Sequence, residues 1–200
     1  MTPIELAERM EQVRSNEVLR SAHQDIRNFY GTRRAARSNV PLMNHIDEGL
    51  KILDALGSND NVRAAWCLHP IYQDCTCPSQ EQHLDNVYHA QVATLVREYR
   101  RVANAALSGI IERSGRSLYC PPIAISTIQE VNDMLVADKV QNRKDFIKHH
   151  AGTHPRSMEL DLYFKCWLSA LGVDDTKYST LAGACLRAVA DLPPVPEEDK

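Results

Sequence analysis

Four polar side chains at the edges of apolar segments could share one pocket. Asp138 and Asn142 stand four residues apart, so both would point from the same face of a helix. His45 and His69 lie upstream, each at the polar edge of a separate apolar segment. Imidazole nitrogens and carboxylate oxygens from separate helices suit a divalent metal in a helical bundle. The pattern predicts a metal site of His45, His69 and Asp138, although each histidine taken singly also fits a core position bonded to a backbone carbonyl.

The segments that must position these side chains have helical patterns. Residues 42–56 place leucine and isoleucine on one face and end at Gly57, the usual residue just past a helix. Residues 62–72 are apolar on nearly all sides, as in a buried helix, and residues 134–145 form the helix of Asp138. Further helices are expected at about 3–16, 17–30, 83–107, 157–171 and 178–192. With no convincing alternating strand, the sequence predicts an all-α fold of about seven or eight helices.

Composition and charge limit the partners. The chain has 200 residues and a net charge of −3, so no global field attracts bulk nucleic acid or a membrane surface. No apolar run approaches the roughly 20 residues that span a bilayer, and the start lacks a signal-peptide pattern. The six cysteines show no repeating spacing, which fits reduced thiols. We expect a cytoplasmic protein with one domain over residues 1–192 and a flexible tail over 193–200.

The candidate residues belong to motifs that follow one another in a familiar order. A basic segment with Arg34 and Arg37 precedes Pro-x-x-x-His at 41–45, then Ala-Ala-Trp-Cys-Leu-His at 64–69 and Val-Ala-Asp-Lys-Val-Gln-Asn at 136–142. Over about residues 21–145, the chain resembles the HD-domain superfamily of metal-dependent phosphohydrolases. Within that superfamily it looks most like RelA/SpoT-type (p)ppGpp hydrolase domains and small phage-type proteins. The resemblance implies a single HD-like helical domain.

The same resemblance implies a divalent metal, Mn²⁺ or Zn²⁺, held by His45, His69 and Asp138. Pro70 stands where the family has the aspartate of its His-Asp doublet, and proline offers no ligand atom. Three protein ligands with an open position are typical of catalytic zinc sites. Hard ions such as Mn²⁺ or Mg²⁺ are held less well by a set with one carboxylate.

Catalytic and substrate-binding roles follow from the resemblance in the same way. Gln73 stands where the RelA/SpoT-type hydrolases have a glutamate, and it could orient a water molecule. Asp74 is the nearest candidate general base, and Asn142 would support Asp138 or contact the substrate. Four basic residues would bind phosphate oxygens, unless they only form a solvated basic face: Arg34, Arg37, Lys139 and Arg143.

These expectations define three functional hypotheses. The first is a metal-dependent phosphohydrolase acting on a nucleotide or nucleotide polyphosphate. The second is a catalytically degenerate HD-like fold, in which Pro70 and Gln73 mark the lost chemistry and a nucleotide or protein partner is bound without turnover. The third is a purely structural helical protein. A homo-oligomer is a further implication of the resemblance.

Overall fold

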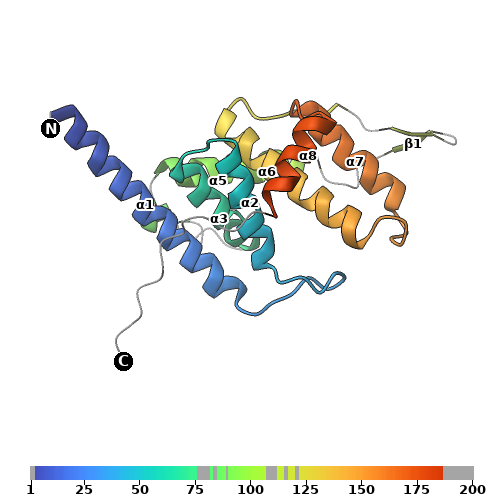
Figure 1. The fold of residues 1–200 in the computed structure, drawn as a ribbon, viewed down its shortest axis with the longest axis horizontal. Helices are drawn as coiled ribbons and strands as arrows, with labels where there is room; N and C mark the ends of the chain where they lie inside the picture. The colour runs from blue at the N-terminus through green and yellow to red at the C-terminus, as the bar shows by residue number, and fades with distance from the viewer. Residues whose placement is uncertain are drawn as a thin grey trace.

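The computed structural model describes residues 3–75, 82, 85–88, 90–106, 112–114, 117–119 and 122–186. Over these residues the fold is all-α, as the sequence predicts (Figure 1). Its helices are α1 (Pro3–Tyr30), α2 (Met43–Ala55), α3 (Asp60–Asp74), α5 (Ala90–Ala105), α6 (Gln129–His149), α7 (Ser157–Ala170) and α8 (Asp175–Ala184). A short antiparallel hairpin joins β1 (Glu112–Ser114) to β2 (Ser117–Tyr119). None of these helices has an apolar stretch sufficient to cross a lipid bilayer.

Helix α1 is one continuous helix where the sequence predicts two. The expected break near Asn16 is wrong, because asparagine weakens a helix but, unlike proline, does not forbid it. Leu19, Ala22 and Ile26 in the second half of α1 are buried, and α1 packs along α3. Tertiary packing therefore stabilises a helix that local propensity alone leaves divided.

Two other predicted boundaries are also wrong. The helix expected over residues 83–107 is interrupted: residues 85–87 are helical, the chain bends at Tyr88, and α5 begins at Ala90. At this bend the buried Tyr88 side chain donates a hydrogen bond to Asp25 on α1. The helix expected over 178–192 is instead α8, which ends at Ala184 in a tighter turn with i→i−3 bonds. Residues 187–200, with the expected tail and domain boundary, lie outside the described residues. The strands of the hairpin are three residues long, too short for an alternating pattern to be recognised.

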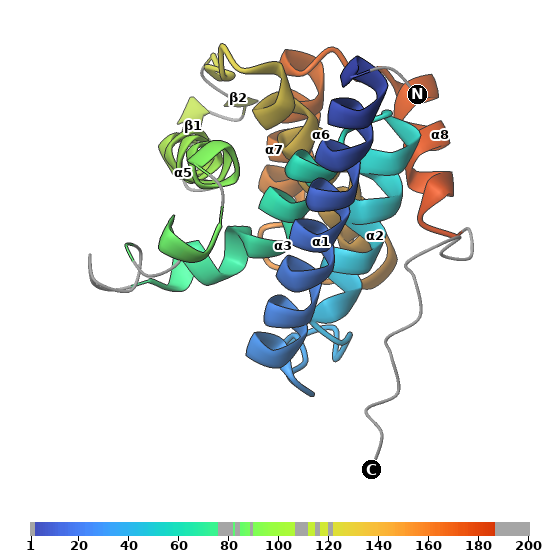
Figure 2. The same cartoon turned by 90° about the vertical axis from the view of Figure 1, so that its left-hand side faces the viewer.

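Helix α3 is largely buried and packs against α1, α2, α5 and α6. Figure 2 shows it beside α1. It begins at a cap in which the Asn59 side chain accepts a hydrogen bond from the Val62 amide at 3.1 Å. Its Trp66 is fully buried and donates its indole N–H to the Ile46 carbonyl on α2 at 3.0 Å. Gly49 makes this contact possible, since a Cβ there would lie 2.2 Å from a carbon of the Trp66 ring. The two helices that carry His45 and His69 are therefore in close contact.

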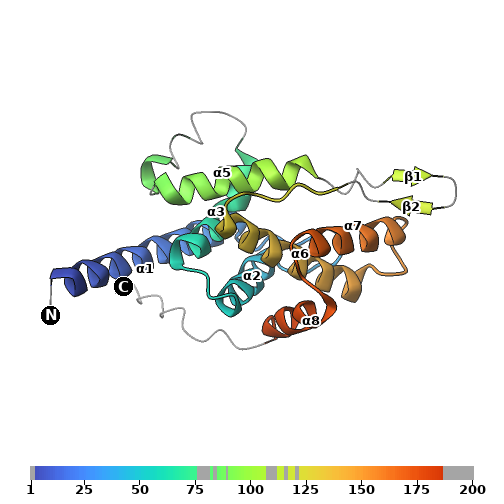
Figure 3. The same ribbon diagram turned by 90° about the horizontal axis from the view of Figure 1, so that it is seen from above.

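Helix α6 is surrounded by other helices and carries polar residues inside the fold. It packs against α2, α3, α5, α7 and α8, and Figure 3 shows it between α5 and α8. Asp138, Lys139 and Gln141 are buried at its centre. Buried polar groups are costly unless they are paired, so their partners identify the part of the structure that is built around them.

Candidate functional site

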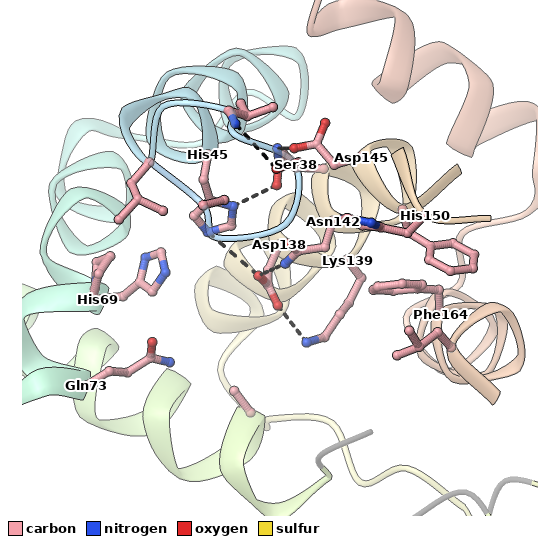
Figure 4. A pocket seen from close by; sticks show the side chains of 18 of the residues that line it. Ser38, His45, His69, Gln73, Asp138, Lys139, Asn142, Asp145, His150 and Phe164 are labelled. Atoms are coloured by element: carbon pink, nitrogen blue, oxygen red, sulfur yellow. Dashed lines mark hydrogen bonds and ion pairs between the residues drawn. The ribbon is translucent and has the colours of Figure 1, made fainter. Parts of the chain in front are cut away.

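A pocket of about 520 Å³ lies where α2, α3, α5, α6 and α7 meet (Figure 4). The three predicted metal ligands, His45, His69 and Asp138, all line it and turn towards the same space. The centroids of the two imidazole rings lie 5.4 Å apart. The Nε2 atom of His45 lies 3.8 Å from the Oδ1 atom of Asp138. The structure thus brings together side chains that are separated by up to 93 positions in the chain.

His69 is held by the backbone of its own helix. Its Nδ1 atom lies 2.6 Å from the carbonyl oxygen of Trp66, so Nδ1 carries the proton and Nε2 keeps its lone pair. In a regular helix this carbonyl would accept the amide N–H of residue 70, but Pro70 has none. Pro70 therefore leaves the Trp66 carbonyl free to accept the hydrogen bond from His69. Burial, followed by the charge of His45, lowers the pKa of His69 to about 3, so the imidazole is neutral at pH 7.

His45 is held by side chains from α2 and α6. Its Nδ1 atom lies 2.7 Å from Oε1 of Gln141. The Nε2 atom of Gln141 donates to Glu48 at 3.0 Å and to Asp145 at 2.8 Å. The Lys144 ammonium binds both of these carboxylates. Hydrogen bonds to charged groups contribute about 1.5–3 kcal/mol each, so this network stabilises one arrangement strongly over its alternatives.

Asp138 is ionised and enclosed by donors. The Lys139 ammonium lies 2.6 Å from its Oδ2 atom, and the Asn142 amide donates to Oδ1 at 2.6 Å. Burial alone would raise the pKa of Asp138, but Lys139, followed by the two pocket histidines, brings it below its ordinary value. Tyr99 also hydrogen-bonds to this carboxylate, and burial together with Asp138 raises the pKa of the Tyr99 hydroxyl well above its usual range.

Lys139 is part of the same buried group and points away from open solvent. Besides Asp138 it contacts the Tyr163 hydroxyl at 3.2 Å, and its Nζ atom lies 4.9 Å from the centre of the Trp167 ring. Burial would lower the pKa of Lys139, but the Asp138 carboxylate raises it above the ordinary value. Lys139 lines the pocket, yet its charge is already balanced, so it adds little to the attraction of an anion.

The donor atoms fit a small divalent cation in part. His69 keeps its Nε2 lone pair, and the Nε2 atom of His45 lies 3.8 Å from the Oδ1 atom of Asp138. Two imidazole nitrogens and one carboxylate oxygen match the three-ligand pattern of catalytic zinc sites. Among the residues that the structure describes, no three His, Cys, Asp or Glu side chains already lie close enough to form a ligand set. Small side-chain movements would be needed, and the metal stays a prediction.

The other predicted site residues divide into two groups. Gln73 and Asn142 line the pocket, while Asp74 follows Gln73 at the exposed end of α3 and does not line it. Arg34 donates to the Asn39 carbonyl at 2.6 Å, and the Arg143 guanidinium lies 4.3 Å from the centre of the Tyr178 ring. Neither is among the described residues that line the pocket.

Arg37 is the predicted phosphate ligand with a connection to the pocket rim. Its guanidinium contacts His154, and the His154 ring lies 6.3 Å from that of His150. His150 lines the pocket. Arg37 is therefore connected through His154 to the lining residue His150, near the end of α6.

Sequence reasoning missed several residues that build the site. Gln141 and Glu48 are buried polar residues three positions from Asp138 and His45, a spacing that places each pair on the same helix surface. That spacing was the available signal. The aromatic wall, by contrast, could not be distinguished from ordinary core by its pattern. It comprises Tyr30, Tyr99, Phe146, Tyr163 and Phe164.

Searches against protein-family models, curated proteins and solved structures find no match to this chain, so the HD-type family stays a prediction from its motifs.

Proposed function

We propose that this pocket is the active site of a divalent-metal-dependent phosphohydrolase that acts on a nucleotide or nucleotide polyphosphate. One observation carries the proposal. His45 and His69 both have their Nδ1 protons engaged, so their Nε2 lone pairs are available in a pocket that also exposes the ionised Asp138. Two imidazole nitrogens and a carboxylate oxygen in one pocket are suited to a divalent cation.

Individual side chains then take distinct roles. His45, His69 and Asp138 would hold the metal, which supplies Lewis acidity towards a phosphoryl oxygen and towards water. Asn142 holds the Asp138 carboxylate in its orientation through the 2.6 Å hydrogen bond. Gln73, one helical turn after His69, would orient the attacking water.

The remaining predicted residues lie at the edges of the site. Asp74, next to Gln73 at the exposed end of α3, lies outside the lining and would accept the proton through one intervening water. Arg37, beside the His154 and His150 pair, would bind phosphate oxygens that extend out of the pocket. Arg34 and Arg143 engage other groups and would add only to the surrounding positive charge.

The aromatic wall supports a nucleotide over a small phosphate ester. Phe146, Tyr163 and Phe164 line the pocket on the α6 and α7 side. Aromatic faces stack on nucleobases, and each such contact is worth about 1–3 kcal/mol. A volume of about 520 Å³ leaves room for a base as well as a phosphate.

A second candidate is a degenerate HD-like protein that binds its ligand without turnover. The specific observation is the Lys139 ammonium, 2.6 Å from Oδ2 of Asp138. An ammonium that already neutralises this carboxylate weakens its attraction for a metal, and Pro70 supplies no replacement. On this hypothesis a nucleotide binds and is recovered unchanged.

Thermal-shift screening with Mn²⁺, Zn²⁺ and a nucleotide panel, followed by product analysis, separates the candidates. The phosphohydrolase proposal expects a metal-dependent rise in Tm and release of phosphate or pyrophosphate, both lost in His45→Gln. His23→Gln is the matched control, because His23 bonds to Asp47 outside the pocket. Unchanged nucleotide with a clear shift supports the second candidate, and Pro70→Asp should then introduce hydrolysis. No shift with any metal or nucleotide contradicts both.

A further inference from the structure

We propose that Gln141 is a positioning residue that holds His45 in the tautomer protonated on Nδ1. This tautomer leaves a lone pair on Nε2 directed into the pocket, and the use of that lone pair for metal binding rests on the proposed function. The tautomer itself does not, because it follows from the hydrogen bonds around Gln141. Gln141 lines the pocket, but the role proposed here is exerted through His45.

The orientation of the Gln141 amide is the first step. One end of the amide lies 3.0 Å from a Glu48 oxygen and 2.8 Å from an Asp145 oxygen. Carboxylates only accept hydrogen bonds, so this end must be the NH₂ group with its two donors. The flipped amide would direct its oxygen at two anions. The Lys144 ammonium also donates to both carboxylates, so their oxygens serve as acceptors in this network.

The state of His45 follows from that orientation. With its nitrogen committed to the carboxylates, Gln141 presents only Oε1 to the imidazole, 2.7 Å from Nδ1. An amide oxygen is an acceptor, so Nδ1 must carry the proton. Gln141 is 1% exposed, which prevents solvent from replacing this contact. Two carboxylates therefore determine, through one amide, which nitrogen of His45 is free.

The alternative tautomer would close the site. A proton on Nε2 would face Asp138 Oδ1, 3.8 Å away, and a closing movement of less than about 1 Å would form a direct hydrogen bond. The lone pair would then point at Gln141 and away from the pocket. Gln141 thus keeps the imidazole and the carboxylate apart as two acceptors that a cation can share.

Histidine ¹⁵N NMR on the metal-free, nucleotide-free protein tests this, at a pH where the imidazoles are neutral. We expect His45 and His69 to carry the proton on Nδ1. His23 should carry it on Nε2, which lies 3.0 Å from the Asp47 carboxylate. In Gln141→Met, which keeps side-chain length, His45 should change to the Nε2–H form or to a mixture. His69 should not change, because its partner is a backbone carbonyl, and it serves as the control in the same spectrum.

A second variant keeps the test decisive if Gln141→Met does not fold. In Glu48→Gln/Asp145→Asn the two partners become amides, which can donate as well as accept hydrogen bonds. Both orientations of the Gln141 amide are then allowed, and His45 should be a mixture of its two tautomers. An Nε2–H or doubly protonated His45 in the unmodified protein would overturn the inference. So would an Nδ1–H form that persists in every folded variant.

Zn²⁺ binding separates this inference from the proposed function. If both hold, Gln141→Met should weaken Zn²⁺ affinity by about 10–100-fold, the usual effect of losing such a supporting partner. If the tautomer is as inferred but the unmodified protein binds no metal, the proposed function fails while the role of Gln141 stands. If the protein binds Zn²⁺ but His45 carries its proton on Nε2 in the metal-free state, the role of Gln141 fails while the metal site of the proposed function stands.

Discussion

The two pocket histidines reach the same state by different means. His69 bonds to a carbonyl of its own helix, three residues back, so the local sequence of α3 is enough to set it. His45 depends on Gln141, which α6 supplies from 96 positions away. The α3 side of the pocket is therefore a local structure, whereas the α2 and α6 side is a tertiary network. The first should survive changes that remove the second, and three predictions follow from that difference.

Asp138→Asn should have the largest effect, because it breaks the α6 side at its charged centre. The change keeps the shape of the side chain but leaves the Lys139 ammonium buried without its counter-ion. Removing one partner of a buried pair costs about 3–5 kcal/mol. Urea unfolding should show this loss, and Asp138→Asn/Lys139→Met should recover much of it. A single variant within about 1 kcal/mol of the unmodified protein would contradict the pairing.

Gly49→Ala should act next, at the contact between the two sides. The added Cβ would meet the buried Trp66 ring at 2.2 Å, so α2 must move away from α3. Overpacking of this kind costs typically 1–3 kcal/mol, and we expect about 3 kcal/mol here. Gly183→Ala is the control, since its Cβ meets nothing within 4 Å in a helix, and it should add up to about 1 kcal/mol. Equal effects in both variants, measured by urea unfolding, would contradict the close approach.

Acid should weaken the α3 side by a smaller amount. The pKa of His69 is about 3 in the folded protein and about 6.5 when unfolded, so the unfolded chain binds more protons in between. The part of the free energy of unfolding that depends on neutral His69 is fully present above about pH 6.5 and is lost as the pH falls towards 3. At about 1.4 kcal/mol per unit, pH 5 should cost about 2 kcal/mol relative to pH 7.

Urea unfolding of metal-free protein at the two pH values measures this loss. His69→Gln should reduce the loss by about the same 2 kcal/mol, because the titrating group is gone. Other titrating groups contribute to both proteins and cancel in the comparison. The same pH dependence in both would show that His69 is not buried as the structure places it.

Local patterns predicted the fold class and the helices closest to the site. The apolar stripe ending at Gly57 indicated α2, and Gly57 does adopt a positive φ of 74° just beyond it. The expected break at Asn16 and the expected helix through Tyr88 were wrong for one reason. In both places a contact between distant segments decides the backbone, and no local pattern encodes it.

The site divides in a similar way. His45, His69 and Asp138 were found because their types and helical edges are visible in the sequence, and the structure brings them together. Their supporting residues were not found, because Gln141 acts through His45 and Glu48, which lie on another helix far away in the sequence. Basic residues near a motif give no indication of which way they point, and Arg143 turns to Tyr178 instead of the pocket.

The rotation of helix α6 about its axis determines where four residues of the site point. Asp138 and Asn142 line the pocket. Gln141 follows Asp138 by three residues, Asp145 follows Asn142 by three, and these two form the supporting network. Each residue of an α-helix turns the next by about 100°, so one inserted or deleted residue before Asp138 would rotate all four away together. Length changes before Asp138 should therefore be excluded from this helix.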